Sequence, residues 1–293
     1  MDAQTRKAWL LFPILILVGA LFAWAGSQGG AFLGSLPVYA LAAAIFLIQW
    51  LVFIPSFLSQ TEKYFDLTGS LTYISVTLFL VLVSGGRDAS PPLDARSYLL
   101  AALVLVWAGR LGTFLFRRVQ KAGKDDRFDE LKPSFIRFLN VWTIQALWIT
   151  FTAAAAHIAI ASSQRQAIDI FAILGLVVWA IGFAIEVIAD SQKSRFNADP
   201  ANRGKFIRSG LWARSRHPNY FGEILIWVGV AIIAIPVLQG WQWVGLISPV
   251  FVTLLLTRVS GVPLLEAKAD KKWGGQPDYE EYKRITPVLI PRL

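Results

Sequence analysis

Apolar residues along this chain form long blocks that are separated by short polar segments. Eight blocks stand out, at residues 8–26, 35–58, 69–84, 97–116, 138–162, 167–189, 221–238 and 241–257. A helix needs about 20 apolar residues to cross the hydrocarbon core of a bilayer, and each block has or nearly has that length. The pattern predicts an all-α integral membrane protein, a multi-span bundle of seven or eight transmembrane helices that forms one membrane domain over residues 1–293.

The composition supports a membrane protein and narrows its chemistry. Hydrophobic residues make up 55% of the 293 residues and charged residues only 16%, whereas soluble domains carry about 25% charged residues. Cysteine is absent, which excludes disulfides, thiolate chemistry and sulfur-ligated metals. Only two histidines occur, 60 residues apart, so histidine-rich iron or zinc sites are not expected and we assign no metal ligands.

The basic residues predict how the chain is oriented. Lysine and arginine favour cytoplasmic loops. With the N-terminus inside, 24 of the 28 lie in cytoplasmic segments, Arg110 lies in a span, and only Arg87, Arg96 and Arg165 lie outside. We therefore expect both termini in the cytoplasm, and no nucleic-acid partner despite the net charge of +9. Topology alone could also produce these basic clusters.

Several polar groups lie at membrane depth, where a charge costs at least about 2.5–3.5 kcal/mol. Glu186 and Asp190 are spaced i,i+4 and share one helix face near the end of the sixth block. Two interpretations stay open: a structural ion pair between Arg110 and Glu186, or a polar wall around a cofactor. For the lone His157, we expect a helix-packing role.

The densest chemistry lies in residues 214–223, which hold two arginines, a histidine, an asparagine, a tyrosine and a glutamate just before an apolar block. Arginine binds phosphate groups bidentately. The glycine-rich G-x-G-x-x-G turn of a soluble dinucleotide-binding domain is absent. A basic cluster at the mouth of a membrane helix suits a charged cofactor that must reach a lipid-soluble substrate in the bilayer.

A set of motifs in a fixed order carries a family resemblance. They include Phe65-Asp-Leu-Thr-Gly-Ser70, Ser215-Arg-His-Pro-Asn-Tyr-Phe-Gly-Glu223, Arg258-Val-Ser-Gly-Val-Pro-Leu-Leu-Glu266 and Tyr282-Lys-Arg284. The chain resembles the bacterial members of the steroid 5-alpha-reductase superfamily, the group known as DUF1295. That superfamily also includes sterol C=C reductases and isoprenylcysteine carboxyl methyltransferases. The similar part is residues 66–293, which leaves residues 1–65 as additional N-terminal spans.

The resemblance implies a reductase that takes hydride from NADPH and reduces a C=C bond in a hydrophobic substrate, either steroid-like or isoprenoid. Its cofactor would lie in a cavity open to the cytoplasm, and its substrate would come from the lipid bilayer. Because the similar family members are bacterial, the resemblance also implies a bacterial inner membrane. Asn202 and Arg203 are weaker candidates for the adenosine end, as are Asp126 and Arg127. By motif matching, the cofactor-binding candidates are Asp190, Asn202, Arg203, Arg214, Arg216, His217, Asn219, Tyr220, Arg258, Glu266, Tyr282, Lys283 and Arg284.

The resemblance also implies candidates for proton transfer. Glu223 stands where the sterol reductases have an acidic residue proposed as proton source, and Tyr220 is the second catalytic candidate. Alternatively, Glu223 only orients Arg216 or a tyrosine. Steroid 5-alpha-reductases carry a Gln-Glu pair before a Pro-Ser-Phe, but here Val52-Phe53 stands in its place, ahead of Pro55-Ser-Phe57. This departure puts reduction of 3-keto steroids in doubt, although not reduction itself.

Two other classes of function stay open. An S-adenosylmethionine-dependent methyltransferase of the isoprenylcysteine carboxyl type would share the Arg216-His-Pro-x-Tyr220 string. That cofactor carries no phosphate and would not need the extended set of arginines. A non-enzymatic lipid carrier or transporter is the third class, but the charges cluster toward one side of the membrane and do not line a path across it.

Overall fold

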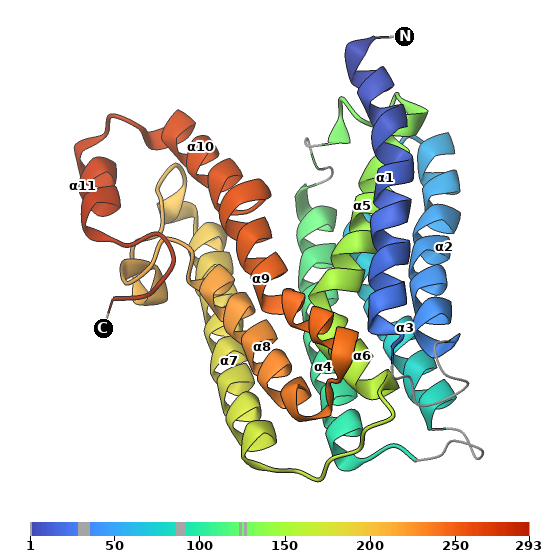
Figure 1. The fold of residues 1–293 in the computed structure, drawn as a ribbon. Coiled ribbons are helices and arrows are strands. Elements are labelled where there is room, and N and C mark those ends of the chain that lie inside the picture. The colour runs from blue at the N-terminus through green and yellow to red at the C-terminus, as the bar shows by residue number, and fades with distance from the viewer. Residues whose placement is uncertain (1, 29–35, 86–91, 123–124, 126–127, 293) are drawn as a thin grey trace. The chain divides into compact units, whose positions relative to one another are not determined.

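A computed structural model describes residues 2–28, 36–85, 92–122, 125 and 128–292 (Figure 1). Helices dominate these ranges, and no strand occurs in them. Seven of the described helices are long and apolar enough to cross a membrane, and a bent pair of helices provides an eighth span if it is counted as one. The expected all-α, multi-span architecture is confirmed, and the chain is an integral multi-pass membrane protein.

The chain divides into two compact units. Unit 1 comprises Met1–Ala172 and Ile233–Ile247, and unit 2 comprises Ile173–Ile232 and Ser248–Leu293. Every site residue expected from the sequence from Asp190 onward belongs to unit 2. The assignment of the whole chain to one membrane domain, with extra spans before residue 66, stays a prediction.

Unit 1 is built from apolar helices that pack through small residues and aromatic rings. The α3 helix packs along α4, and the Ser70 hydroxyl donates a hydrogen bond to Ala108 O where Gly112 leaves room for it. Phe53, Phe138 and Trp142 form part of an aromatic core. The helices of unit 1 are α1 (Ala3–Gly26), α2 (Leu36–Leu58), α3 (Phe65–Ser84), α4 (Ala95–Ala122), α5 (Phe135–Thr152) and α6 (Ala154–Ala161).

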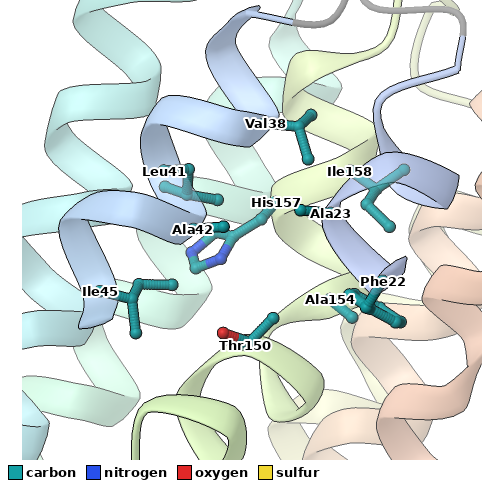
Figure 2. A pocket seen from close by; sticks show the side chains of 10 residues that line it. All are labelled: Phe22, Ala23, Val38, Leu41, Ala42, Ile45, Thr150, Ala154, His157 and Ile158. Atoms are coloured by element: carbon teal, nitrogen blue, oxygen red, sulfur yellow. The ribbon is translucent and has the colours of Figure 1, made fainter. Parts of the chain in front are cut away.

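The apolar block at residues 138–162 is broken in the structure. Helices α5 and α6 meet at Ala153 with a bend of 61°. His157, on α6, is buried, and its Nε2 lies 2.9 Å from Thr77 Oγ1 on α3. Figure 2 shows its ring beside a small apolar cavity, of about 20 Å³, that residues of α1, α2, α5 and α6 line. The contact with Thr77 supports the packing role expected for this histidine.

A buried arginine at the start of α4 connects several segments of unit 1. Arg96 is only 1% exposed and lies at the start of α4. Its guanidinium pairs with Asp169 at 2.7 Å and donates to Ile233 O at 2.6 Å and Ala167 O at 2.8 Å. Because buried charges are stable only when they are paired and hydrogen-bonded, this set of contacts compensates the buried guanidinium. It joins α4 to the segment before α7 and to Ile233 in the last turn of α8.

Unit 2 depends on one close helix pair, α7 with α8, which run side by side in Figure 1. A Cβ on Gly182 would lie 2.6 Å from Gly222 O, and one on Gly229 would lie 2.5 Å from Gly175 O. The elements of unit 2 are α7 (Ile170–Ala198), η3 (Gly210–Ala213), α8 (Pro218–Ala234), α9 (Ile247–Leu254), the π-helical turn η6 (Leu255–Val259), α10 (Val262–Trp273) and α11 (Pro277–Ile285).

The last two apolar blocks are joined by a very short connection. The candidate spans Pro218–Val237 and Gly240–Trp273 are separated by Leu238 and Gln239. Gly240 has a φ of 49°, which a residue without a Cβ adopts readily. The Gln239 side chain caps the helical turn that follows, and Gln242 bonds back to the Gln239 backbone. The second span extends further than the apolar pattern predicted, through α10.

Candidate functional site

The loop that precedes α8 is held on two sides. On one side, Trp212 Nε1 donates to Ala189 O of α7 at 3.0 Å, and Leu211 N donates to Gln192 Oε1 at 2.9 Å. On the other side, Arg216 N donates to Pro287 O at 2.9 Å in the C-terminal segment. These bonds fix the backbone that carries the densest motif of the sequence before any ligand binds.

Four of the expected site residues meet around one carboxylate. Glu266, on α10, accepts hydrogen bonds from Arg216 Nη1 and from His217 Nε2, the latter at 2.7 Å. The rings of His217 and Tyr220 are stacked, with centroids 5.6 Å apart and an interplanar angle of 9°. We call Arg216, His217, Tyr220 and Glu266 the Glu266 cluster. It joins the start of α8 to α10 inside unit 2.

The Glu266 cluster retains unused hydrogen-bonding capacity. His217 is 4% exposed, yet its Nδ1 has no hydrogen-bond partner among the described residues, and the same is true of Arg216 Nε. Buried polar atoms are normally satisfied, and an exception calls for an explanation such as a missing ligand. Because Nε2–H points to a carboxylate, the neutral His217 ring offers Nδ1 as an acceptor, while Arg216 Nε–H is a donor.

The π-helical turn η6 lies between α9 and the Glu266 cluster. The hydrogen bond from Ser260 N to Leu255 O, at 2.9 Å, has the five-residue spacing of a π-helix. Single π turns often occur at functional sites. This one carries Arg258, which is exposed, and is followed by Gly261, where a Cβ would lie 2.9 Å from the Tyr220 ring. The absence of a side chain at Gly261 thus allows Tyr220 to pack against this turn.

The C-terminal helix α11 contributes one of its three expected residues to the loop. Tyr282 donates from its hydroxyl to Trp212 O at 2.7 Å, and burial raises its pKa to about 12, so it stays a donor at physiological pH. Lys283 pairs with Asp270 at 2.8 Å, and this hydrogen bond raises the pKa of Lys283. Arg284 instead binds Glu281 on its own helix and is largely exposed.

The other expected residues lie around this centre. Asp190 is buried on α7, and Asn219 and Glu223 are half-buried on α8, where their i,i+4 spacing puts them on one face. Asn202 is half-buried, and Arg203 and Arg214 are exposed. The candidates Asp126 and Arg127 lie outside the described residues, as does Arg87. Arg110 and Glu186 belong to different units, so their pairing stays a prediction.

Sequence reasoning missed a cavity in unit 2. Its volume is about 280 Å³, and its walls include Asn202, Lys205, Phe206, Arg208 and Gln276. Of these residues, only Asn202 was a candidate. An aromatic residue between two basic residues over 205–208 was the available signal, but such a short run is common on cytoplasmic loops.

A model of one protein family matches residues 52–286, which cover most of the chain. Its description is "Protein of unknown function (DUF1295)". The chain belongs to the DUF1295 family. The match includes every candidate site residue, and it confirms the family that the ordered motifs indicated.

Curated relatives of this DUF1295 protein include reductases. It is 30% identical over 121 residues to steroid 5-alpha-reductase DET2 of Arabidopsis thaliana, covering 41% of this chain and 40% of that one. It is 28% identical over 118 residues to rat 3-oxo-5-alpha-steroid 4-dehydrogenase 1, covering 40% of each. An uncharacterized protein of Schizosaccharomyces pombe is 25% identical over 186 residues, covering 52% and 54%.

These relatives support membership of the steroid 5-alpha-reductase superfamily. The DUF1295 chain spans only about 40% to 54% of the length of the relatives it matches. No solved structure matches it. The arrangement of its own residues must therefore support any more specific function.

Proposed function

We propose that this protein is an NADPH-dependent membrane reductase of a C=C bond in a hydrophobic substrate, steroid-like or isoprenoid. The observation that carries the proposal is the Glu266 cluster, in which Arg216 and His217 are fixed by one carboxylate while Arg216 Nε and His217 Nδ1 keep unused capacity. The relatives named as reductases support it independently. The proposed site faces the cytoplasm, where both termini also lie.

The residues present fit a phosphate-bearing dinucleotide. Arg214 and Arg258 are exposed cations near the two ends of the Glu266 cluster in sequence, and guanidinium groups bind phosphates bidentately. The free His217 Nδ1 accepts and Arg216 Nε donates, so the cluster pairs with a polar group that has both functions, such as a carboxamide. We assign Asp190, Asn202, Arg203, Asn219, Tyr282, Lys283 and Arg284 to the surrounding cofactor-binding surface.

NADPH, when bound, supplies the hydride. The chain's own residues have three tasks in the proposed reaction. Glu266 orients Arg216 and His217 through the two hydrogen bonds described above. Tyr220, stacked on His217, forms an aromatic wall and is a second source of a hydroxyl proton. Glu223, half-buried on α8, is the proposed proton donor, because a carboxyl group can serve as a general acid.

The charge of unit 2 favours NADPH over the S-adenosylmethionine alternative. The cationic side chains of unit 2 extend well beyond the Arg216-His-Pro-x-Tyr220 string that the two enzyme classes share. That wide basic surface matches a cofactor with several phosphates better than one with none.

The experiment follows NADPH absorbance while the purified protein is mixed with a panel of enones and polyprenyl compounds. We expect oxidation of NADPH with at least one of them, and weak or no turnover of 3-keto-4-ene steroids. Glu223→Gln keeps the size of the side chain but removes the titrating group. General acid catalysis contributes about 10²–10⁴-fold, so turnover should fall by that factor while NADPH affinity stays within about threefold.

A structural role for Glu223 gives a different result. In that case NADPH affinity and thermal stability fall together in Glu223→Gln, and turnover of bound cofactor changes little. Glu130→Gln is the matched control, because Glu130 is exposed before α5 and is not among the proposed site residues. Loss of activity in this control would show that any removed carboxylate disturbs the protein.

A further inference from the structure

The cavity in unit 2 lies outside the Glu266 cluster and has its own chemistry. Its volume is about 280 Å³, just below the roughly 300–1,000 Å³ of sites that enclose a whole small molecule. It is therefore suited to one end of a larger ligand. Lys205 and Arg208 bring two positive charges to its walls, and Asp278 brings one negative charge.

An aromatic ring in the cavity wall is held firmly in place. The Phe206 ring packs against Trp273, Tyr279 and Tyr282, with centroids 5.8, 5.2 and 5.4 Å away. The Arg208 guanidinium carbon lies 5.9 Å from the centre of the same ring. A fixed aromatic face next to a guanidinium can take a flat heterocycle and a phosphate at the same time.

The rim of the cavity is also fixed. Trp273 Nε1 donates to Gly204 O at 2.6 Å, and Gly204 has a φ of 82°, which favours glycine. Asn202 Nδ2 donates to Phe196 O at 3.1 Å, so its amide group is fixed to the cavity wall. The cavity therefore needs no large rearrangement before it accepts a ligand.

A chain of contacts joins this cavity to the loop of the Glu266 cluster. Phe206 packs on Tyr282, and the Tyr282 hydroxyl donates to Trp212 O in the segment just before Arg216. A ligand with two separated polar ends, such as a dinucleotide, could thus use both places within one unit. A ligand with a single phosphate would use only one of them.

We propose that this cavity binds the 2′-phosphoadenosine end of NADPH, with Arg208 and Lys205 on the phosphate and Phe206 against the adenine. This inference rests on the proposed reductase function and deepens it, because it names the residues that select NADPH over NADH. Asn202 and Gln276 supply amide groups at the cavity for the polar edge of the base.

Calorimetric titration in a neutral detergent without anionic lipid tests this assignment. The ligands are NADPH, NADH, adenosine 2′,5′-bisphosphate and inorganic phosphate, and the variants are Arg208→Gln and Lys205→Gln. Lys268→Gln is the matched control, since Lys268 is exposed on α10 and does not line the cavity. We expect Arg208→Gln to weaken NADPH binding about tenfold and to leave NADH binding within about twofold, as fits loss of a charged hydrogen bond.

Each other outcome overturns a stated part of the proposal. If wild-type protein prefers NADPH and Arg208→Gln and Lys205→Gln keep that preference, the cavity assignment is wrong while the reductase function stands. If inorganic phosphate competes as well as adenosine 2′,5′-bisphosphate, the cavity is only an anion site and the adenine assignment is wrong. If neither NADPH nor NADH binds to the wild-type protein, the proposed function fails and the cavity assignment fails with it.

Discussion

Glu266, on α10, contacts residues at the start of α8 that are far from it in the sequence. The motif string made Arg216, His217 and Tyr220 candidates because their residue types suit a charged cofactor. The pairing of Arg216 and His217 with Glu266 could not be predicted from spacing, since 50 and 49 residues separate the partners. Hydropathy and residue type predict which side chains are polar at a membrane boundary. Hydropathy and residue type do not predict which of several carboxylates those side chains contact.

The His217–Glu266 bond makes a prediction that needs no substrate. With Nε2–H donated to a carboxylate, the neutral His217 ring should be protonated at Nε2 and bare at Nδ1. Because the chain has only two histidines, ¹⁵N-histidine labelling gives two ring systems to resolve by NMR. His157→Gln removes one of them and so assigns the other to His217.

Glu266→Gln sharpens this test. The amide can turn its NH₂ group toward the ring, so the fraction of His217 protonated at Nδ1 should rise relative to wild type. Glu281→Gln should leave both ring systems unchanged, because Glu281 bonds Arg284 on the exposed side of α11. Finding the Nδ1–H form in the wild-type protein, or no response to Glu266→Gln, would contradict the geometry of the Glu266 cluster.

At the scale of elements, the apolar blocks predicted the helices well because span length follows directly from bilayer thickness. Bilayer thickness does not predict two other features of the helices. The break between α5 and α6 lies inside an apolar block, and the π-helical turn η6 lies at the end of one. Hydropathy detects neither feature, because it measures how apolar the residues are and not how their backbone is hydrogen-bonded.

The short connections between helices also carry specific contacts, of which the Glu62–Lys132 pair is the clearest. Lys132 Nζ lies 2.6 Å from Glu62 Oε2, and Asp125 N donates to Glu62 Oε1 at 2.8 Å. Burial raises the pKa of Glu62, but these two hydrogen bonds outweigh it and hold that pKa below the usual range. The bond to Glu62 raises the pKa of Lys132, although burial opposes this.

The lowered pKa of Glu62 determines how the stability of the fold depends on pH. A lowered folded-state pKa means that Glu62 stabilises the fold above its unfolded pKa of about 4.5, and this stabilisation is lost as pH falls through the folded value. We expect Glu62→Gln to cost roughly 1.5–3 kcal/mol near neutral pH. The difference in Tm between wild type and variant should shrink in acid below pH of about 4.

Thermal unfolding in detergent measures that difference. Asp129→Asn is the control, because Asp129 contacts Lys132 at 3.2 Å from a more exposed position and its loss should cost less than about 1 kcal/mol. A Tm difference between wild type and Glu62→Gln that is independent of pH would show that the Glu62 carboxylate contributes no titrating stabilisation.

For the whole molecule, the charge distribution predicts that both termini lie on the cytoplasmic side. This requires the bent pair α5 and α6 to count as one crossing, which gives eight spans. The chain has no cysteine, so single cysteines can be placed without any background labelling. Three exposed positions are suitable. Gln4 is in the first turn of α1, Gln164 is in the connection before α7, and Lys271 is on α10.

Labelling of intact cells with a membrane-impermeant maleimide checks this topology. Gln164→Cys should react in intact cells, whereas Gln4→Cys and Lys271→Cys should react only after the membrane is permeabilised. Reaction of Lys271→Cys in intact cells would place the Glu266 cluster in the wrong compartment for a cytoplasmic cofactor. Opposite results for Gln4→Cys and Lys271→Cys would mean that the bent pair does not cross the membrane.

We propose that unit 2 binds NADPH, and direct binding to the purified protein tests this most simply. Calorimetric titration in detergent compares NADPH, NADH and S-adenosylmethionine on the same sample, at low and at raised salt. We expect NADPH to bind clearly more tightly than NADH, with an advantage that shrinks as salt screens the exposed arginines. Tight binding of S-adenosylmethionine, with no binding of NADPH, would contradict this account.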